Sequence, residues 1–183
     1  HLVLLESIAA IIGPAIHNAR LFEASRHEAT ERTAFAEIGR IINSATDIQE
    51  TYQQFAAVLR NVIQVDLITI SLITNDRQRF EHDFIWQSGN LPPVSSNVFD
   101  LAGSPVEQIT DARSSVLLSS NSTSELIASY PTMGEVVRKG TNSGIGVPLG
   151  ASDEVIGILS IGSADIDAYS HADVEKLERI GAQ

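Results

Sequence analysis

Apolar side chains recur at helical spacing through the first forty-odd residues of the chain. They follow alternating steps of three and four residues, as expected for one apolar seam along a helix. The seam becomes polar after Phe22 and resumes at Phe35. A continuous helix here would be roughly 65 Å long at 1.5 Å per residue, and Pro14 should bend or break it. A helix of that length needs a partner, so we expect it to form a homodimer. The seam residues are Leu5, Ile8, Ile12, Ala15, Ala19 and Phe22.

A second amphipathic helix is predicted from about Ile48 to Ile63. Asp47, followed three residues later by Glu50, resembles a capping box at its start. Apolar residues then recur at helical spacing and predict a buried stripe. The stripe residues are Ile48, Tyr52, Phe55, Leu59 and Val62.

From residue 67 the apolar pattern changes to the alternation of strands. The run 67–73 is rich in β-branched residues and ends at an Asn-Asp turn. Further strands are expected at 80–86, 98–101 and 116–118. A short helix is expected near 105–109, because Pro105 suits a first helical turn.

The polar stretch 119–124 is predicted to be a mobile loop, and 126–139 reads as two helical pieces divided by Pro131.

The last third of the chain has the clearest pattern. Strands at 145–149 and 155–162 flank a turn of the usual hairpin length. Ser170 then caps a final helix, with Asp173 three residues later and an apolar face of Val174, Leu177 and Ile180. The order of elements favours an α+β domain in which an antiparallel sheet carries helices.

Composition narrows the possible functions. The 12 Lys and Arg residues against 23 Asp and Glu give a formal net charge of −11, which disfavours nucleic acid and anionic membrane surfaces as partners. The absence of Cys excludes disulfides, thiolate metal sites and thiol chemistry, and it fits a reducing cytoplasmic location. The apolar run 2–12 is too short to span a bilayer; a membrane anchor elsewhere in a parent protein stays open.

No catalytic or metal-binding constellation emerges from the spacing of polar residues. The five histidines include no pair at metal-ligand spacing, and Glu81-His82-Asp83 is interpreted as a solvated strand edge. The stretch from Asp165 lacks the glycine and the final Glu of a calcium loop. Gly144-Ile145-Gly146 is not a phosphate loop, because no third glycine or lysine follows. We therefore expect no metal, no cofactor and no enzymatic activity in this fragment.

The two ends of the chain resemble each other. When 1–11 is laid over 173–183, four positions are identical, among them Leu5 with Leu177 and Ile8 with Ile180. Two amphipathic helices in phase can align by chance. The alternative is that the chain begins in the closing helix of a preceding, homologous domain of a tandem array.

Several stretches together resemble the GAF domain family. They are Gly-Val-Pro-Leu at 146–149, Glu-Val-Ile-Gly-Ile-Leu-Ser at 154–160 and Tyr-Ser at 169–170. The segment 15–22 is similar to the helix that commonly leaves a GAF domain toward its neighbour. We therefore divide the chain into a signalling helix at 1–34, the closing helix of a preceding GAF domain, and a GAF domain at 35–183.

The resemblance implies a PAS-related central antiparallel sheet with helices on both faces. The terminal helices would pack on one face, and loops on the other would enclose a small-molecule pocket. Bilin attachment and methionine sulfoxide reductase chemistry use Cys in this family and are excluded here. The Asn-Lys-Phe-Asp-Glu signature of cyclic-nucleotide-binding members is not found. A PAS-like fold is the alternative, disfavoured by the closing motifs.

A pocket of this kind would be lined by apolar residues and a few polar ones. These residues are equally suited to a plain core, and that interpretation stays open. The candidate ligand-binding residues are Phe84, Trp86, Phe99, Arg113, Leu118, Met133 and Asn142.

The leading hypothesis is a sensory domain that binds a small molecule or partner. It would pass the signal through dimerising terminal helices to an output domain, for which the resemblance favours a histidine kinase. The second hypothesis is a ligand-free dimerisation and spacer module. An enzyme is the third, and it would need convergent polar residues that the sequence does not display.

Overall fold

The computed structural model describes residues 48–182, except 90, 94–95, 120–122 and 152–153, together with scattered helical positions between 23 and 38. The predicted dimer seam from Leu5 to Phe22, the predicted break at Pro14 and the N-terminal part of the internal resemblance lie outside the described residues. Within them, no helix is long and apolar enough to cross a bilayer.

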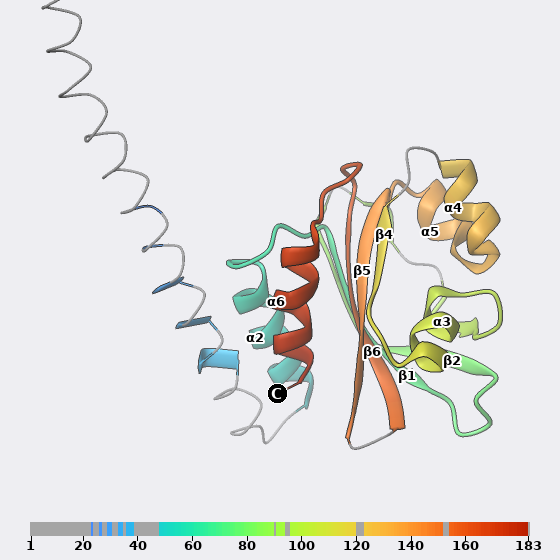
Figure 1. Cartoon of the computed structure of the whole chain (residues 1–183), viewed down its shortest axis with the longest axis horizontal. Helices are drawn as coiled ribbons and strands as arrows, with labels where there is room; N and C mark the ends of the chain where they lie inside the picture. Colours follow the sequence, from blue (N-terminus) through green and yellow to red (C-terminus); the bar gives the residue numbers. More distant parts are fainter. Residues whose placement is uncertain are drawn as a thin grey trace, which may run out of the picture.

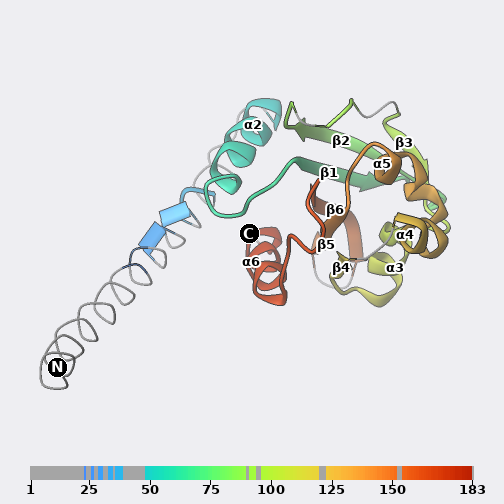
Figure 2. The same cartoon turned by 90° about the horizontal axis from the view of Figure 1, so that it is seen from above.

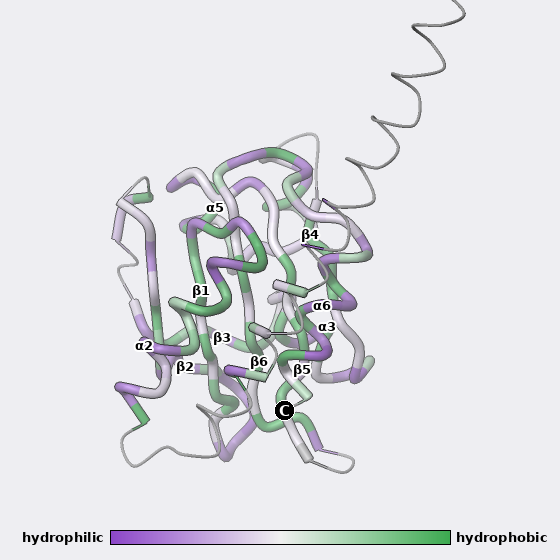
Figure 3. Tube along the Cα trace, turned by 90° about the vertical axis from the view of Figure 1, so that its left-hand side faces the viewer, coloured by the Kyte–Doolittle hydropathy of each residue, from purple (hydrophilic) through white to green (hydrophobic). Residues whose placement is uncertain are grey.

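Six antiparallel strands form one sheet in the order β3-β2-β1-β6-β5-β4. Apolar side chains concentrate in the central strands, as expected for strands covered on both faces (Figure 3). The strands are β1 (Leu67–Ile73), β2 (Arg79–Gln87), β3 (Val98–Asp100), β4 (Val116–Ser119), β5 (Ser143–Ala151) and β6 (Glu154–Ser163).

Helices cover both faces of this sheet, so the domain has three layers (Figures 1 and 2). The first and last helices of the domain, α2 (Ile48–Leu59) and α6 (His171–Gly181), lie on one face. The elements between β3 and β5 cover the other face. They are α3 (Pro105–Ala112), α4 (Thr123–Ser129), the 3-10 helix η1 (Pro131–Met133) and α5 (Gly134–Arg138).

Each face of the sheet has its own apolar core. On the first face, Leu59 of α2 and Leu177 and Ile180 of α6 are buried against the strands. The end of α6 approaches β5 closely, because a Cβ at Gly181 would lie 3.1 Å from Val147 Cγ2. On the second face, Ile109 of α3 packs with residues of the sheet, α4 and α5.

The structure confirms the predicted elements and corrects several boundaries. All six strands form, and Pro131 divides 126–139 into short helical pieces as predicted. The predicted loop at 119–124 is partly wrong, because Ser119 ends β4 and α4 begins at Thr123. The predicted helix to Ile63 ends at Leu59, and turns follow it.

Ile48 does not belong to the buried stripe of α2. Its side chain is 58% exposed, whereas Phe55 and Leu59 further along the helix are buried. The first turn of α2 therefore contributes little to the core, which the helix reaches only from Tyr52 onward. Periodicity alone identifies the apolar stripe but not how far the partner surface extends beneath it.

One irregularity in the sheet decides which way several side chains point. Ile70 of β1 is paired with Phe84 of β2, but the next residue, Ser71, is paired with His82. Asp83 is therefore an extra residue in β2, which is a β-bulge. Its carboxylate accepts a hydrogen bond from the Tyr52 hydroxyl of α2 at 2.7 Å.

Candidate functional site

A cavity of about 110 Å³ lies between the sheet and the helices α3 to α5. Strands β1, β2, β5 and β6 form its floor, and the second-face helices form its roof. Among the described residues that line it, none is Asp, Glu, Lys or Arg. The cavity is therefore mostly apolar with a few polar groups, as expected for a small-molecule site.

Glycines occupy inward positions of the floor and let the roof approach it closely. Gly144 and Gly146 of β5 and Gly162 of β6 line the cavity, while the intervening Ile145 is buried in the opposite core. A Cβ at Gly146 would lie 2.5 Å from Ile109 Cδ1 of α3. Alternation along β5 thus places apolar side chains on one face of the sheet and almost no side-chain volume on the other.

Hydroxyl groups take up the remaining positions of the floor. Thr69 of β1 is paired with Ser160 of β6, and Ser160 is paired with Gly146. Thr69 and Thr141 are 5% and 6% exposed, Ser160 is half-buried, and none of their hydroxyls is among the fully buried polar atoms that lack a partner in the described structure. Because these residues line the cavity, their hydroxyls are available to a ligand or to water.

An aromatic wall closes the cavity on the side of β2 and β3. The ring centroids of Phe80 and Phe99 are 5.4 Å apart in a stacked arrangement. The His82 ring lies 5.0 Å from the Phe99 ring and 5.8 Å from the Phe80 ring. These three rings pack against one another and form an aromatic side of the cavity lining.

His82 is the titratable residue of the cavity wall. Its Nδ1 lies 2.9 Å from the hydroxyl of Ser71, which is 1% exposed. Burial lowers the pKa of His82 from 6.5 to about 4, because desolvation disfavours the charged ring. His82 is therefore neutral at physiological pH, and the described lining of the cavity carries no formal charge.

The roof begins at a well-capped helix. Ser104 accepts a hydrogen bond from the Glu107 backbone N–H at 3.1 Å, and its hydroxyl donates to the Leu101 carbonyl at 2.6 Å. Pro105 at the first helical position is already restricted to a helical φ. This start directs Val106 and Ile109 toward the cavity.

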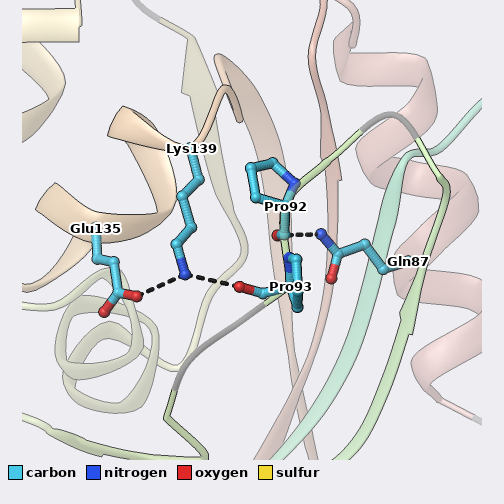
Figure 4. A network of polar contacts seen from close by, with 5 residues as sticks. All are labelled: Gln87, Pro92, Pro93, Glu135 and Lys139. Atoms are coloured by element: carbon cyan, nitrogen blue, oxygen red, sulfur yellow. Dashed lines mark hydrogen bonds and ion pairs between the residues drawn. The ribbon is translucent and has the colours of Figure 1, made fainter.

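A group of polar contacts, here called the latch, joins α5 to the segment that follows β2 (Figure 4). Lys139 donates to the Pro93 carbonyl and pairs with Glu135, both at 2.7 Å. Gln87 at the end of β2 donates to the Pro92 carbonyl at 2.5 Å. A recess of about 10 Å³ is lined in part by the latch residues Gln87 and Lys139 and shares Phe99 with the lining of the main cavity.

Three of the predicted site residues lie where the sequence suggested. Phe99, Leu118 and Met133 line the cavity. Phe84 and Trp86 do not line it, because they pack in the core on the opposite face of the sheet. There the Arg60 guanidinium carbon lies over the Trp86 ring, 4.1 Å from its centroid.

The bulge at Asp83 explains this error. Phe80, His82, Phe84 and Trp86 would share one face of a regular strand. One extra residue reverses the orientation of every side chain beyond it.

The two predicted polar residues lie outside the cavity lining. Arg113 is exposed at the C-terminal end of α3, in the left-handed conformation with φ of 51°. Asn142 donates to the Ala164 carbonyl at 2.7 Å and so joins the start of β5 to the segment after β6. Neither is among the residues that line the cavity.

Sequence reasoning missed the residues that give the cavity its polarity. The sequence predicts a solvated strand edge at His82, but its side chain contributes to the cavity wall. The hydroxyls of Thr69 and Ser160 were not singled out. The available signal was the presence of Thr, Ser and Gly at alternate positions of otherwise apolar strands, because such positions leave space on a buried face.

The cavity does not have the features of a hydrolytic site. Ser71 and His82 have the separation of a nucleophile and its base, but Ser71 is buried and the lowered pKa of His82 makes it a weak base. Among the described residues, no group of three His, Asp or Glu side chains could hold a metal ion. The arrangement is suited to binding.

Solved structures with the same fold come from several kinds of protein. The GAF domain from Acinetobacter phosphoenolpyruvate-protein phosphotransferase is 21% identical, with a TM-score of 0.64, over 84% of this chain and 89% of that one. Free methionine-R-sulfoxide reductase from Neisseria meningitidis is 16% identical, with a TM-score of 0.66, over 83% and 84%. A phycocyanobilin-bound GAF domain from a cyanobacterial phytochrome is 13% identical, with a TM-score of 0.66, over 83% and 90%. At these identities the likeness establishes the fold.

The family itself is established by sequence. No curated protein sequence matches the chain. The family model for the GAF domain, however, matches residues 47–183, which is most of the chain and includes every element around the cavity. The chain therefore belongs to the GAF domain family, a family of sensory and ligand-binding domains.

Proposed function

We propose that this GAF domain is a non-catalytic sensor that binds a small molecule in the cavity between its sheet and the helices α3 to α5. The observation that carries the proposal is the cavity of about 110 Å³ itself, whose mostly apolar lining includes the hydroxyls of Thr69, Thr141 and Ser160. A plain core would fill such a space, because protein interiors are close-packed. Substrate-bound and bilin-bound structures with this fold support the proposal.

The signal would cross the sheet to the terminal helices. Strands β5 and β6 form part of both cores, with Gly146 and Ser160 facing the cavity and Val147 and Leu159 facing α2 and α6. A ligand that shifts the floor therefore also shifts the surface on which Leu177 of α6 packs. A population shift between two helix arrangements is sufficient for signalling.

A cavity-filling variant tests the binding part of this proposal. Ser160→Ile adds apolar volume at the floor and removes no hydrogen bond within the described structure. We expect it to stabilise the free domain by about 1 kcal/mol and to abolish stabilisation by any ligand found in a thermal-shift screen of neutral, acidic and basic compounds. Ligand stabilisation that survives in Ser160→Ile would place binding elsewhere and contradict the proposal.

The alternative function is a ligand-free dimerisation and spacer module. It predicts that no compound in the screen stabilises the domain, while Ser160→Ile still raises its melting temperature. The small volume of the cavity favours this alternative more than any other observation, because about 110 Å³ is below the range of typical drug-sized pockets. The screen distinguishes the two functions directly.

We further propose that the domain works in the cytoplasm as a homodimer, with the seam from Leu5 to Phe22 pairing in parallel, and that its output is a histidine kinase. The support is the apolar seam itself, which continues beyond the compact domain. Sedimentation velocity over a range of concentrations tests the dimer. A strict monomer at high concentration would rule it out, and Ile8→Lys and Ile12→Lys should each weaken the association.

A further inference from the structure

The cavity selects ligands by charge. Its described lining contains hydroxyls, one imidazole and apolar groups, but no Asp, Glu, Lys or Arg. Moving an ion out of water into such surroundings is strongly unfavourable unless a counter-charge meets it. The imidazole does not supply one, because His82 is neutral at physiological pH. The ligand that fits is therefore uncharged.

The hydrogen bonds around His82 determine its tautomer. The Ser71 hydroxyl is 1% exposed, and its only hydrogen bond in the described structure is the one to His82 Nδ1 at 2.9 Å. A buried hydroxyl donor without an acceptor is costly, so Ser71 donates and Nδ1 accepts. Nε2 then carries the proton and has no partner among the described residues. The wall thus offers an N–H donor, and the ligand must present an acceptor.

The shape of the cavity limits the size of the ligand. Its volume of about 110 Å³ is close to the ~150 Å³ of an engineered apolar cavity that binds benzene. The rings of Phe80, His82 and Phe99 form one wall and favour a flat partner. One six-membered ring matches this space, whereas a fused double ring exceeds it.

We propose that the cavity recognises an uncharged, single-ring aromatic molecule that carries a hydrogen-bond acceptor, which His82 Nε2–H and the hydroxyls of Thr69 and Ser160 bind. This inference rests on the proposed function, because it names the ligand class of the same site. It goes further by identifying His82 as the residue that determines specificity.

Two matched pairs of probes test the inference by ligand-observed NMR titration of the purified chain. Phenol and toluene have similar shapes, but toluene has no acceptor. Benzamide and benzoate also have similar shapes, but benzoate is an anion. We expect phenol to bind about fivefold more tightly than toluene, which corresponds to about one hydrogen bond. Benzamide should bind, and benzoate should not bind measurably.

The double variant His82→Phe/Ser71→Ala is the matched control. It keeps a ring in the wall and removes both partners of the hydrogen bond, so that no buried hydroxyl is left unsatisfied. Phenol affinity should fall to that of toluene, and toluene affinity should stay within twofold. Thr69→Val, which keeps the side-chain shape, should also lower the affinity for phenol. Nitrogen chemical shifts of His82 should independently identify the Nε2–H tautomer.

The outcomes separate this inference from the proposed function. Benzoate binding more tightly than benzamide, phenol binding that the double variant does not change, or an Nδ1–H tautomer would each overturn the ligand class while leaving a ligand site in place. Failure of every probe and of the wider screen to bind would instead overturn the proposed function, and the inference with it.

Discussion

Burial, a hydrogen bond and the lack of a charged neighbour in the described cavity lining all act on the imidazole ring of His82. Its ring packs against Phe80 and Phe99, its Nδ1 faces Ser71, and no charged side chain lines the cavity beside it in the described structure. The neighbouring Asp83 bonds to Tyr52 of α2 instead. Because the ring loses water without gaining a counter-charge, the folded domain resists its protonation.

This resistance predicts an acid sensitivity of folding. The folded-state pKa of about 4 lies below the ordinary 6.5, so the unfolded chain binds a proton that the folded chain does not. The free energy of unfolding is therefore not affected by His82 protonation above pH 6.5. It falls by on the order of 3 kcal/mol as the pH drops from 6.5 to 4. Urea unfolding across this range should show the loss. The double variant His82→Phe/Ser71→Ala should flatten it, and parallel curves would contradict the assignment.

A half-buried tyrosine, Tyr52, and a buried one, Tyr169, allow the contribution of a hydroxyl hydrogen bond to stability to be compared. Tyr52 donates to Asp83 at 2.7 Å, whereas the buried hydroxyl of Tyr169 has no partner among the residues that the structure describes. Burial raises the pKa of Tyr169, and Asp66, Asp173 and Asp165 raise it further. We expect Tyr169→Phe to leave the free energy of unfolding unchanged or to increase it, and Tyr52→Phe to lower it by about 1 kcal/mol. A larger loss for Tyr169→Phe in urea titrations would reveal a partner, such as a bound water.

The limits of sequence reasoning are clearest at Phe84 and Trp86. Both were correctly expected to share a face, but not the face that lines the cavity. A bulge leaves no mark in the alternation of β2, since Asp83 looks like any outward residue of a regular strand. Phe99 and Leu118 belong to the short strands β3 and β4, and Met133 belongs to η1. All three line the cavity, and no bulge interrupts β3 or β4 to reverse their side chains.

At the level of elements, local sequence signals account for most of the fold. Ser104 with Pro105 begins α3, and Ser170 with Asp173 forms the capping box of α6 as predicted. These signals act within four residues, which is why they can be read from sequence. The end of α2 at Leu59 and the exposure of Ile48 depend on contacts with the sheet and could not be read in this way.

The latch at Lys139 joins two elements distant in sequence, α5 and the segment after β2 (Figure 4). Lys139 is partly exposed, so its ion pair with Glu135 should contribute less than about 1 kcal/mol. We expect Lys139→Met to change global stability little but to increase backbone hydrogen exchange in 88–97 and 134–141 several-fold, because local opening becomes easier. Mass spectrometry of exchanged peptides measures this.

Lys176→Met is the control for the latch. Lys176 pairs with Asp173 on α6, on the opposite side of the sheet, at 3.5 Å. Its loss should leave exchange near the cavity unchanged. Equal exchange at 88–97 in the two variants would show that Lys139 does not hold this segment.

On the scale of the whole molecule, the sheet separates two apolar cores. The helices α3 to α5 lie on one side of the sheet, and α2 and α6 lie on the other (Figure 1). The cavity is on the first side, and the core under α2 and α6 is on the second. The formal net charge of the chain is −11, while the described cavity lining carries no charge. The proposed recognition site thus lies across the sheet from the surface on which α2 and α6 pack.

The central claim is that a small neutral ring enters this cavity. Intermolecular nuclear Overhauser effects between phenol ring protons and the methyl groups of the domain locate a bound ring most directly. The account predicts such effects to Ile109, Leu118 and Met133 around the cavity. Effects confined to Leu59 and Leu177 on the other face, or none at saturating phenol, would contradict it.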